Sequence, residues 1–398
     1  MLNNIESALL KLLGMVLHGK DVSAVLPDLT DTEWEQLFAL ADRHEVLALL
    51  APVLESEKIP QGQRPAAETK IARTIHNGIQ LQVLNASLTA LLEEEDIRAV
   101  TLKGCTIARW YPVPEYRKMT DIDLYVQDRE KAKKAVQILC ANGFRQSEEW
   151  HANHHVALIS GQNQEVELHT SWADAFQEKS LNELVEKLQI ESVRHEKCVD
   201  VQGFSIWAYD TPWQACYLLI HMLLHFVGSG FGLRNLCDWV VLWEHCEDDG
   251  ERAEFWRWIG RSGAADFARA MTELCVRFLG LPREKSPIPE GEPMETEVVF
   301  AFLRDVLDAG EFGYSEAERM VGMDGSSVSA YVREFHHQMH LNFQTAGKCP
   351  MLWPVLWAAT LARFLQNNRK LKRPSVGSIM KKAKSRGELV RRLMTPQK

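Results

Sequence analysis

The sequence lacks the features typical of secreted, zinc-finger and membrane-spanning proteins. Its eight cysteines are scattered and include no Cys-X-X-Cys pair, which argues against a disulfide framework and against structural zinc. The N-terminal segment has neither a basic stretch nor a small-residue cleavage site, so it predicts an amphipathic helix and not a signal peptide. The roughly 18 uninterrupted apolar residues that a membrane span needs do not occur either. We therefore expect a cytoplasmic protein.

Positive charge is also scarce, except at the C-terminal end. The 398 residues contain 45 Lys and Arg against 54 Asp and Glu, a formal net charge of −9, which argues against general nucleic acid binding. Residues 369–398, however, hold eleven Lys or Arg and the single acid Glu388, a formal +10. This basic tail predicts contact with an anionic membrane surface or an acidic partner, or else pairing with the acidic body of the chain.

The spacing of apolar residues divides the chain into four parts. Residues 1–96 show helical spacing and predict a helical lead-in. In residues 97–210 short β-branched segments alternate with turns, which predicts an α+β core with a small mixed β-sheet. Residues 211–368 predict a helical domain, and residues 369–398 form the basic tail. The predicted fold class is therefore α+β, with the core flanked by N-terminal and C-terminal helical regions.

Local signals predict the elements within these parts. Strands are predicted at 98–104, 121–126, 155–160, 165–170 and 204–210. The turn at 161–163 predicts a hairpin, and Asp128 predicts the N-cap of a helix that ends at 142–143. The run Thr211-Pro212-Trp213-Gln214 predicts a capping box with Thr211 as the N-cap. Further helices are predicted at 212–226, 233–247, 252–261, 264–279, 296–309, 327–343 and 355–366.

Acidic residues on two predicted strands form the first candidate site. Asp121 and Asp123 are two apart, so their side chains leave the same face of the strand. Adjacent carboxylates repel, and burying them requires a cation such as Mg²⁺, whereas a solvated strand face is the alternative interpretation. Glu165, Glu167 and His169 share one face of a later strand, so a third carboxylate is available and His169 is a possible substrate contact.

Two basic features point to an anionic ligand. Lys103 and Gly104 lie where a strand ends and a helix opens, a place where backbone N–H groups can hold phosphate. Arg117 precedes the two aspartates and can meet a phosphate oxygen, although for this residue alone a surface loop position is the simpler interpretation.

Three segments resemble a known family. LKG at 102–104, YRKMTDIDLYV at 116–126 and VELHTSW at 166–172 resemble the uncharacterised nucleotidyltransferase family of the DNA polymerase beta-like nucleotidyltransferase superfamily. That superfamily has a glycine loop after its first strand, an aspartate pair on the next strand and a third carboxylate on a later one. The helical lead-in and the helices after residue 211 also resemble the family. The resemblance implies a nucleotidyltransferase fold for the α+β core.

The resemblance also implies roles for individual residues. The implied catalytic residues and metal ligands are Asp121, Asp123 and Glu167, with Glu165 as the register alternative. The implied nucleotide-binding residues are Lys103, Gly104 and Arg117. Where the superfamily usually has Gly-Gly or Gly-Ser, this chain has Gly104-Cys105, which leaves the phosphate geometry open. The implied reaction transfers a nucleotidyl group from an NTP to an acceptor hydroxyl or phosphate, with two Mg²⁺ or Mn²⁺ ions as cofactors.

Other patterns and other functions remain open at this stage. His221 and His225 are four apart on a predicted helix but lack the Glu of an HExxH motif, so packing near the core or the cleft is favoured over zinc binding. Arg234 and Asp238 predict an intrahelical ion pair. The alternative function is a non-catalytic nucleotide- or partner-binding protein on the same fold. A third, an aminoglycoside-modifying enzyme, requires an acidic acceptor pocket.

Overall fold

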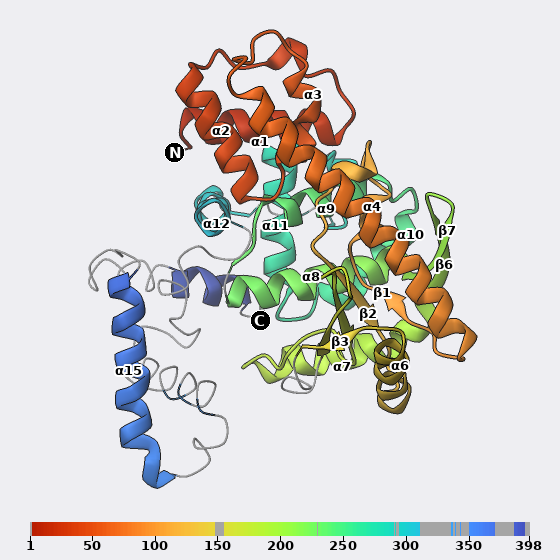
Figure 1. The fold of residues 1–398 in the computed structure, drawn as a ribbon. Coiled ribbons are helices and arrows are strands. Elements are labelled where there is room, and N and C mark those ends of the chain that lie inside the picture. The colour runs from red at the N-terminus through yellow and green to blue at the C-terminus, as the bar shows by residue number, and fades with distance from the viewer. Residues whose placement is uncertain are drawn as a thin grey trace.

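The structure is a computed structural model of the 398-residue chain. It describes residues 2–147, 155–228, 230–289, 291, 294–310, 336, 339, 343, 350–370 and 386–394. A small mixed sheet lies between two helical regions, which confirms the predicted α+β class (Figure 1).

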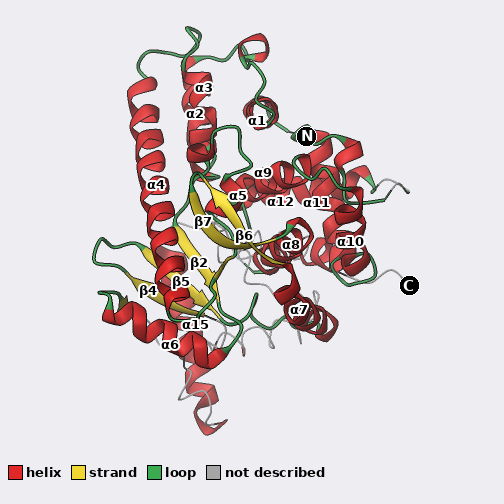
Figure 2. Ribbon diagram, turned by 90° about the vertical axis from the view of Figure 1, so that its right-hand side faces the viewer, coloured by secondary structure: helices red, strands yellow, loops and turns green. Residues whose placement is uncertain are grey.

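The first 96 residues are helical, as predicted. The helices are α1 (Asn4–Leu17), α2 (Asp31–Arg43), α3 (Ala51–Leu54) and α4 (Arg64–Glu94). Capping boxes start α1 and α2: the side chains of Asn3 and Thr30 accept the N–H groups of Glu6 and Glu33, respectively. The 31-residue α4 leaves this group and extends past the sheet (Figures 1 and 2).

The main sheet has five strands in the order β1-β2-β5-β4-β3. They are β1 (Val100–Thr101), β2 (Asp121–Tyr125), β3 (Arg145–Gln146), β4 (His155–Ile159) and β5 (Glu165–His169). The pair β2–β5 is parallel, and the other pairs are antiparallel. The predicted hairpin is confirmed as β4–β5, and its turn contains Asn163 at a φ of 63°. The predicted strand at 98–104 is shorter than expected because only two of its residues pair.

Helix α6 (Arg129–Ala141) belongs to the crossover between the parallel strands β2 and β5. Its N-cap is Asp128, as predicted, whose side chain accepts the N–H groups of Glu130 and Lys131. Helices α4 and α6 lie on one side of the sheet, where Ile122 and Leu124 are buried, and α8 lies on the other (Figure 2). Because neighbouring side chains of a strand point to opposite faces, the acidic residues of β2 and β5 point away from α4 and α6.

A second, separate hairpin follows helix α7 (Lys179–Ser192). It consists of β6 (Glu196–Val201) and β7 (Phe204–Tyr209), and β7 is the strand predicted at 204–210. Its two-residue turn, Gln202 and Gly203, has φ values of 51° and 88°, as a type I′ turn requires. The sequence predicts neither α7 nor β6, and β6 is hard to recognise because four of its six residues are polar or charged or carry a thiol.

The helices after the core agree with the predicted ranges to within a few residues. They are α8 (Thr211–Val227), α9 (Leu233–Glu244), α10 (Asp249–Ile259), α11 (Ala265–Phe278), α12 (Thr296–Ala309) and α15 (Trp353–Lys370). The one-turn α5 (Cys105–Ala108) follows β1, and short 3-10 helices lie at Ser23–Val25, Leu47–Leu50, Pro114–Tyr116, Val193–His195, Arg283–Lys285 and Pro350–Leu352. The helix predicted at 327–343 falls outside the described residues, apart from three single positions.

The predicted cap of α8 is wrong by one residue. Asp210, not Thr211, is the N-cap, and its side chain accepts the N–H of Trp213. With Asp210 as the N-cap, Trp213 and not Gln214 lies at the third helical position, so Gln214 closes no capping box. Its side-chain amide donates to the carbonyl of Leu102, 2.5 Å away. A polar side chain at this position therefore ties α8 to the end of β1.

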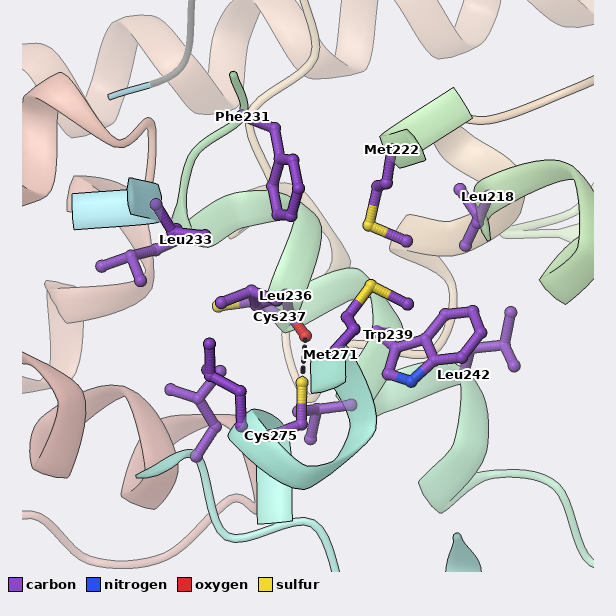
Figure 3. Packing of buried hydrophobic residues seen from close by; sticks show 14 of the residues in the cluster. Leu218, Met222, Phe231, Leu233, Leu236, Cys237, Trp239, Leu242, Met271 and Cys275 are labelled. Carbon is purple, nitrogen blue, oxygen red and sulfur yellow. Dashed lines mark hydrogen bonds between the residues drawn. The ribbon is translucent and has the colours of Figure 1, made fainter. Parts of the chain in front are cut away.

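One buried cluster joins the two helical regions. It includes Leu13 of α1, Leu102 after β1, Trp239 of α9 and Val390 near the C-terminus. Figure 3 shows its centre between α8, α9 and α11, where the thiol of Cys275 donates to the carbonyl of Leu236. The cluster contains residues from both sides of positions 97, 211 and 369, so the chain does not form a separate core on each side of them. The domain boundaries at these positions therefore stay predictions from the sequence.

Part of the basic tail folds onto the body. Residues 386–394 form a helix, in which Arg386 pairs with Asp305 at 3.0 Å and Arg392 pairs with Glu295 at 2.5 Å. The basic residues from 372 to 384 and at 398 lie outside the described residues, so the membrane or acidic partner stays a prediction for them. In the part of the chain that is described, no helix is both long and apolar enough to cross a bilayer.

His44 makes the stability of this fold sensitive to acid. Its side chain is fully buried, and its Nδ1 accepts the backbone N–H of Leu233 at the start of α9. Burial, aided by the charge of Arg43, lowers the pKa of His44 from 6.5 to about 3. The unfolded chain takes up this proton near its ordinary pKa, so the free energy of unfolding should fall as the pH is lowered from about 6.5 towards 3, by on the order of 3 kcal/mol at about pH 4.5.

Urea unfolding at neutral and acidic pH measures this effect. His44→Gln keeps an acceptor for the Leu233 N–H but cannot titrate, so its stability should fall less between the two pH values than that of the wild type. His76→Gln, an exposed change on α4, should retain the wild-type dependence. Equal pH dependence in the wild type and His44→Gln would contradict the argument.

Candidate active site

The register of β2 and β5 brings the predicted acidic residues together. Asp121 lies opposite Glu165, Asp123 opposite Glu167, and Tyr125 opposite His169. Asp123 is 2% exposed, and the Glu167 side chain is 26% exposed. Glu165, at the outer end of the row, is exposed to solvent. Of the two register alternatives, Glu167 is therefore the carboxylate beside the buried Asp123.

Lys103 lies between the two aspartates. Its Nζ is 3.6 Å from Asp121 Oδ2 and 3.3 Å from Asp123 Oδ2. The backbone hydrogen bond from Leu102 N to Asp123 O, 3.0 Å long, fixes the end of β1 beside β2. Burial alone would lower the pKa of Lys103, but the two carboxylates outweigh it and raise this pKa. The ammonium group therefore neutralises part of the charge of the acidic pair.

His169 has the corresponding position between Asp123 and Glu167. Its Nε2 is 3.2 Å from Asp123 Oδ1 and 3.2 Å from Glu167 Oε2. Burial by itself lowers the pKa of His169, but the hydrogen bonds to the two carboxylates raise it to about 9. Carboxylates and cations thus alternate across the face of the sheet, and this alternation permits the buried Asp123 to lie beside two partly exposed acids. We call this row the acidic cluster; it consists of Asp121, Lys103, Asp123, His169 and Glu167.

The acidic cluster has donor atoms that suit a divalent cation. Asp123 Oδ2 is a buried carboxylate oxygen with no hydrogen bond, and Lys103 Nζ, 3.3 Å away, is the cation that compensates its charge in this structure. Carboxylate oxygens are the ligands that Mg²⁺ and Mn²⁺ prefer. Among the described residues, however, the three-ligand group with atoms within 4.8 Å of one another is His155, Glu167 and His169, not the predicted three carboxylates. Lys103 and His169 separate those carboxylates in this structure.

Gly104 follows Lys103 in a conformation that glycine favours, with a φ of 74°. It is the N-cap of α5, but α5 is a single turn. The dipole of so short a helix is small, so the helix start is not by itself a phosphate site. The predicted phosphate contact of this loop therefore depends on Lys103 more than on Gly104.

Arg117, predicted to contact the nucleotide, is buried in an ion pair. It is 2% exposed, and its Nε and Nη2 donate to the two carboxylate oxygens of Asp238, each at 2.7 Å. The Tyr111 hydroxyl also donates to this carboxylate, at 2.6 Å. Asp238, from α9, already satisfies the guanidinium group, so the predicted contact of Arg117 with a nucleotide stays a prediction that this structure does not support. Arg117 instead joins the loop before β2 to α9.

Arg234 is the functional candidate that sequence reasoning missed. The predicted ion pair with Asp238 is replaced by contacts to other segments: Arg234 Nε lies 3.4 Å from Glu45 Oε2, and its Nη1 donates to the carbonyl of Lys118. Its charge, after that of Lys103, lowers the pKa of Asp121 against the effect of burial. Arg234 therefore supplies positive potential to the acidic cluster. No local sequence signal near Arg234 indicates its contact with Glu45, which lies far away along the chain.

Helix α8 contributes three aromatic residues on the side opposite α4 and α6. Tyr217, His221 and His225 recur every four residues, with ring-centroid separations of 5.8 and 4.5 Å. Burial, aided by the charge of Lys103, lowers the pKa of His221 and lowers that of His225 to about 4. Both imidazoles are therefore neutral neighbours of the acidic cluster. Within the described residues neither histidine belongs to a group of three possible metal ligands.

Comparison with known proteins identifies the family. Residues 30–280, well over half of the chain, match the model of the family described as uncharacterised nucleotidyltransferase. The chain belongs to this family. The uncharacterised nucleotidyltransferase match extends from the N-cap of α2 to just beyond α11, so it includes the acidic cluster as well as Glu45 and Arg234. The assignment confirms the resemblance and supports nucleotidyl transfer as the general class of activity.

The chain was also compared with curated proteins and with solved structures. No curated protein matches the chain. Among solved structures, it is similar to an antigenic nucleotidyltransferase-like protein from Paracoccidioides brasiliensis, with 15% sequence identity and a TM-score of 0.31. The similar region covers 45% of this chain and 85% of that one.

Proposed function

We propose that this uncharacterised nucleotidyltransferase family member is an enzyme that transfers a nucleotidyl group from an NTP to an acceptor hydroxyl or phosphate. The observation that carries the proposal is the parallel, in-register pairing of β2 with β5, which sets Asp123 beside Glu167. Asp121 precedes Asp123 on the same face of β2. These three residues are the proposed ligands of Mg²⁺ or Mn²⁺.

Each charged residue of the site has a proposed role. Asp121, Asp123 and Glu167 hold the divalent ions, which when bound neutralise charge on the transferred phosphate and on the pyrophosphate leaving group. Lys103, whose ammonium group contacts the carboxylates of both aspartates, binds phosphate oxygens of the NTP. Arg234 replaces Arg117 as the second basic residue near the phosphates, since its charge reaches Asp121. His169 positions Asp123 and Glu167 through its contacts with both.

The chemistry requires little of the protein beyond binding and orientation. The acceptor oxygen forms a bond to the α-phosphorus, the bond between the α-phosphorus and the bridging oxygen breaks, and pyrophosphate leaves. When the acceptor is a hydroxyl, its proton passes to a carboxylate.

Pyrophosphate release tests the proposal. The full chain is incubated with each labelled NTP in turn, with Mg²⁺ or Mn²⁺ and a cell extract as the source of acceptors. We expect pyrophosphate and a labelled product with at least one nucleotide, and neither with Asp121→Asn. Asp96→Asn is the control, because Asp96 is a fully exposed carboxylate whose side chain pairs with Lys131. Nucleotide binding without pyrophosphate release would favour the non-catalytic alternative.

A further inference from the structure

A second donor set lies at one end of the acidic cluster, across the β4–β5 hairpin. His155 of β4 and His169 of β5 are cross-strand partners, with ring centroids 5.2 Å apart. Glu167 precedes His169 by two residues and therefore shares its face of the sheet. One ligand atom from each of these three residues lies within 4.8 Å of those of the other two.

The hairpin backbone holds these three residues in place. The antiparallel register pairs His155 with His169 and Ala157 with Glu167, so all three donors lie on paired strand positions. The small Ala157 side chain adds no bulk between His155 and Glu167. His155 is half-buried, and the Glu167 side chain is 26% exposed, which leaves an approach from solvent. Donors fixed on strands lose little freedom when an ion binds.

The chemistry of this set differs from that of the three carboxylates. Once an arriving ion displaces the proton that the contacts with Asp123 and Glu167 hold on His169, two imidazole nitrogens and one carboxylate oxygen suit Zn²⁺ and other first-row transition ions, which bind imidazole well. Mg²⁺ prefers oxygen ligands and gives up its water reluctantly. A three-residue set also leaves coordination positions for water or for a ligand oxygen.

We propose that His155, Glu167 and His169 form a binding site for a first-row transition ion, which we call the hairpin metal site. Glu167 is shared between this site and the proposed Mg²⁺ or Mn²⁺ ligands. Binding of the ion does not depend on nucleotidyl transfer, so the two proposals can fail separately.

Metal titration of the chelator-treated full chain tests the hairpin metal site. We expect Zn²⁺ to bind by calorimetry with one equivalent per chain, excess Mg²⁺ not to displace it, and Co²⁺ in its place to give visible absorption bands. His155→Ala should weaken Zn²⁺ binding about 100-fold, and His155→Gln should also weaken it, which guards against misfolding of one variant. Asp121→Asn should retain Zn²⁺ binding even where it abolishes pyrophosphate release.

Two controls separate this site from other donors. Cys140→Ser/Cys198→Ser removes both exposed thiols of the described residues and should leave the Zn²⁺ affinity unchanged. His76→Ala changes an exposed histidine on α4 and should do the same. The proposal is overturned if His155→Ala and His155→Gln bind Zn²⁺ as tightly as the wild type, or if the double cysteine variant loses the binding.

Discussion

Asp123→Asn should lower kcat/KM for nucleotidyl transfer by about a thousandfold, equivalent to about 4 kcal/mol of transition-state stabilisation. The carboxylate it removes is 2% exposed and lies within 3.3 Å of both Lys103 Nζ and His169 Nε2. An amide has nearly the same shape but no charge, so it neither holds a divalent ion nor balances the two cations. Initial rates of pyrophosphate release, with the NTP identified by the screen described above, measure the loss.

Two further variants make this result interpretable. Asp96→Asn removes a fully exposed carboxylate and should retain wild-type rates. Glu167→Gln tests the carboxylate on the neighbouring strand β5. The Glu167 side chain is more exposed than that of Asp123, so this change is the smaller risk to folding. Full activity of a correctly folded Asp123→Asn protein would reject the assignment of Asp123.

Asp238→Asn should lower the free energy of unfolding by about 3–5 kcal/mol. The change leaves the Arg117 guanidinium buried without a counter-charge, since both residues are 2% exposed and joined by two 2.7 Å hydrogen bonds. Removing one partner of a buried pair costs far more than the pair contributes, because the remaining charge stays desolvated. Urea denaturation at neutral pH gives the difference.

A double variant distinguishes this cause from a simple packing defect. Arg117→Met removes the uncompensated charge, so Arg117→Met/Asp238→Asn should be more stable than Asp238→Asn alone. Asp96→Asn again serves as the control, because its partner Lys131 is half-exposed and such pairs contribute about 1 kcal/mol or less. A double variant no more stable than Asp238→Asn would assign the loss to packing instead.

The strands and helices could be predicted where their signals are local. The alternation around Asp121 and Asp123 predicts β2, and the Asp128 cap predicts the start of α6, because each signal lies within a few residues. Prediction fails at β6, whose polar residues resemble a loop, and at the α8 cap, where Asp210 and Thr211 are both good caps. The structure distinguishes the two, because Asp210 has the extended backbone of a cap and its side chain accepts the N–H of Trp213.

In the candidate site, too, the features with a local sequence signal could be predicted and those that depend on packing could not. That Asp121 and Asp123 share a face follows from strand geometry, and a third carboxylate on Glu167 could be expected from the later strand. Arg117 and Arg234 could not be assigned in this way. Each is an arginine near a predicted strand or helix end, and nothing within several residues of either one indicates that Asp238 pairs with the first and Glu45 with the second.

By itself the sequence determined the α+β class, the order of most elements and the presence of several carboxylates on two strand faces. These properties depend on side-chain periodicity and capping, which act over about one helical turn or a few strand residues. Only the tertiary structure places Lys103 and His169 between the carboxylates. It also pairs His155 with His169 across the β4–β5 hairpin and forms the ion pair between Asp238 and Arg117. The physical reason is distance along the chain: Arg117 and Asp238 are 121 residues apart, and only strand register and helix packing bring such residues into contact.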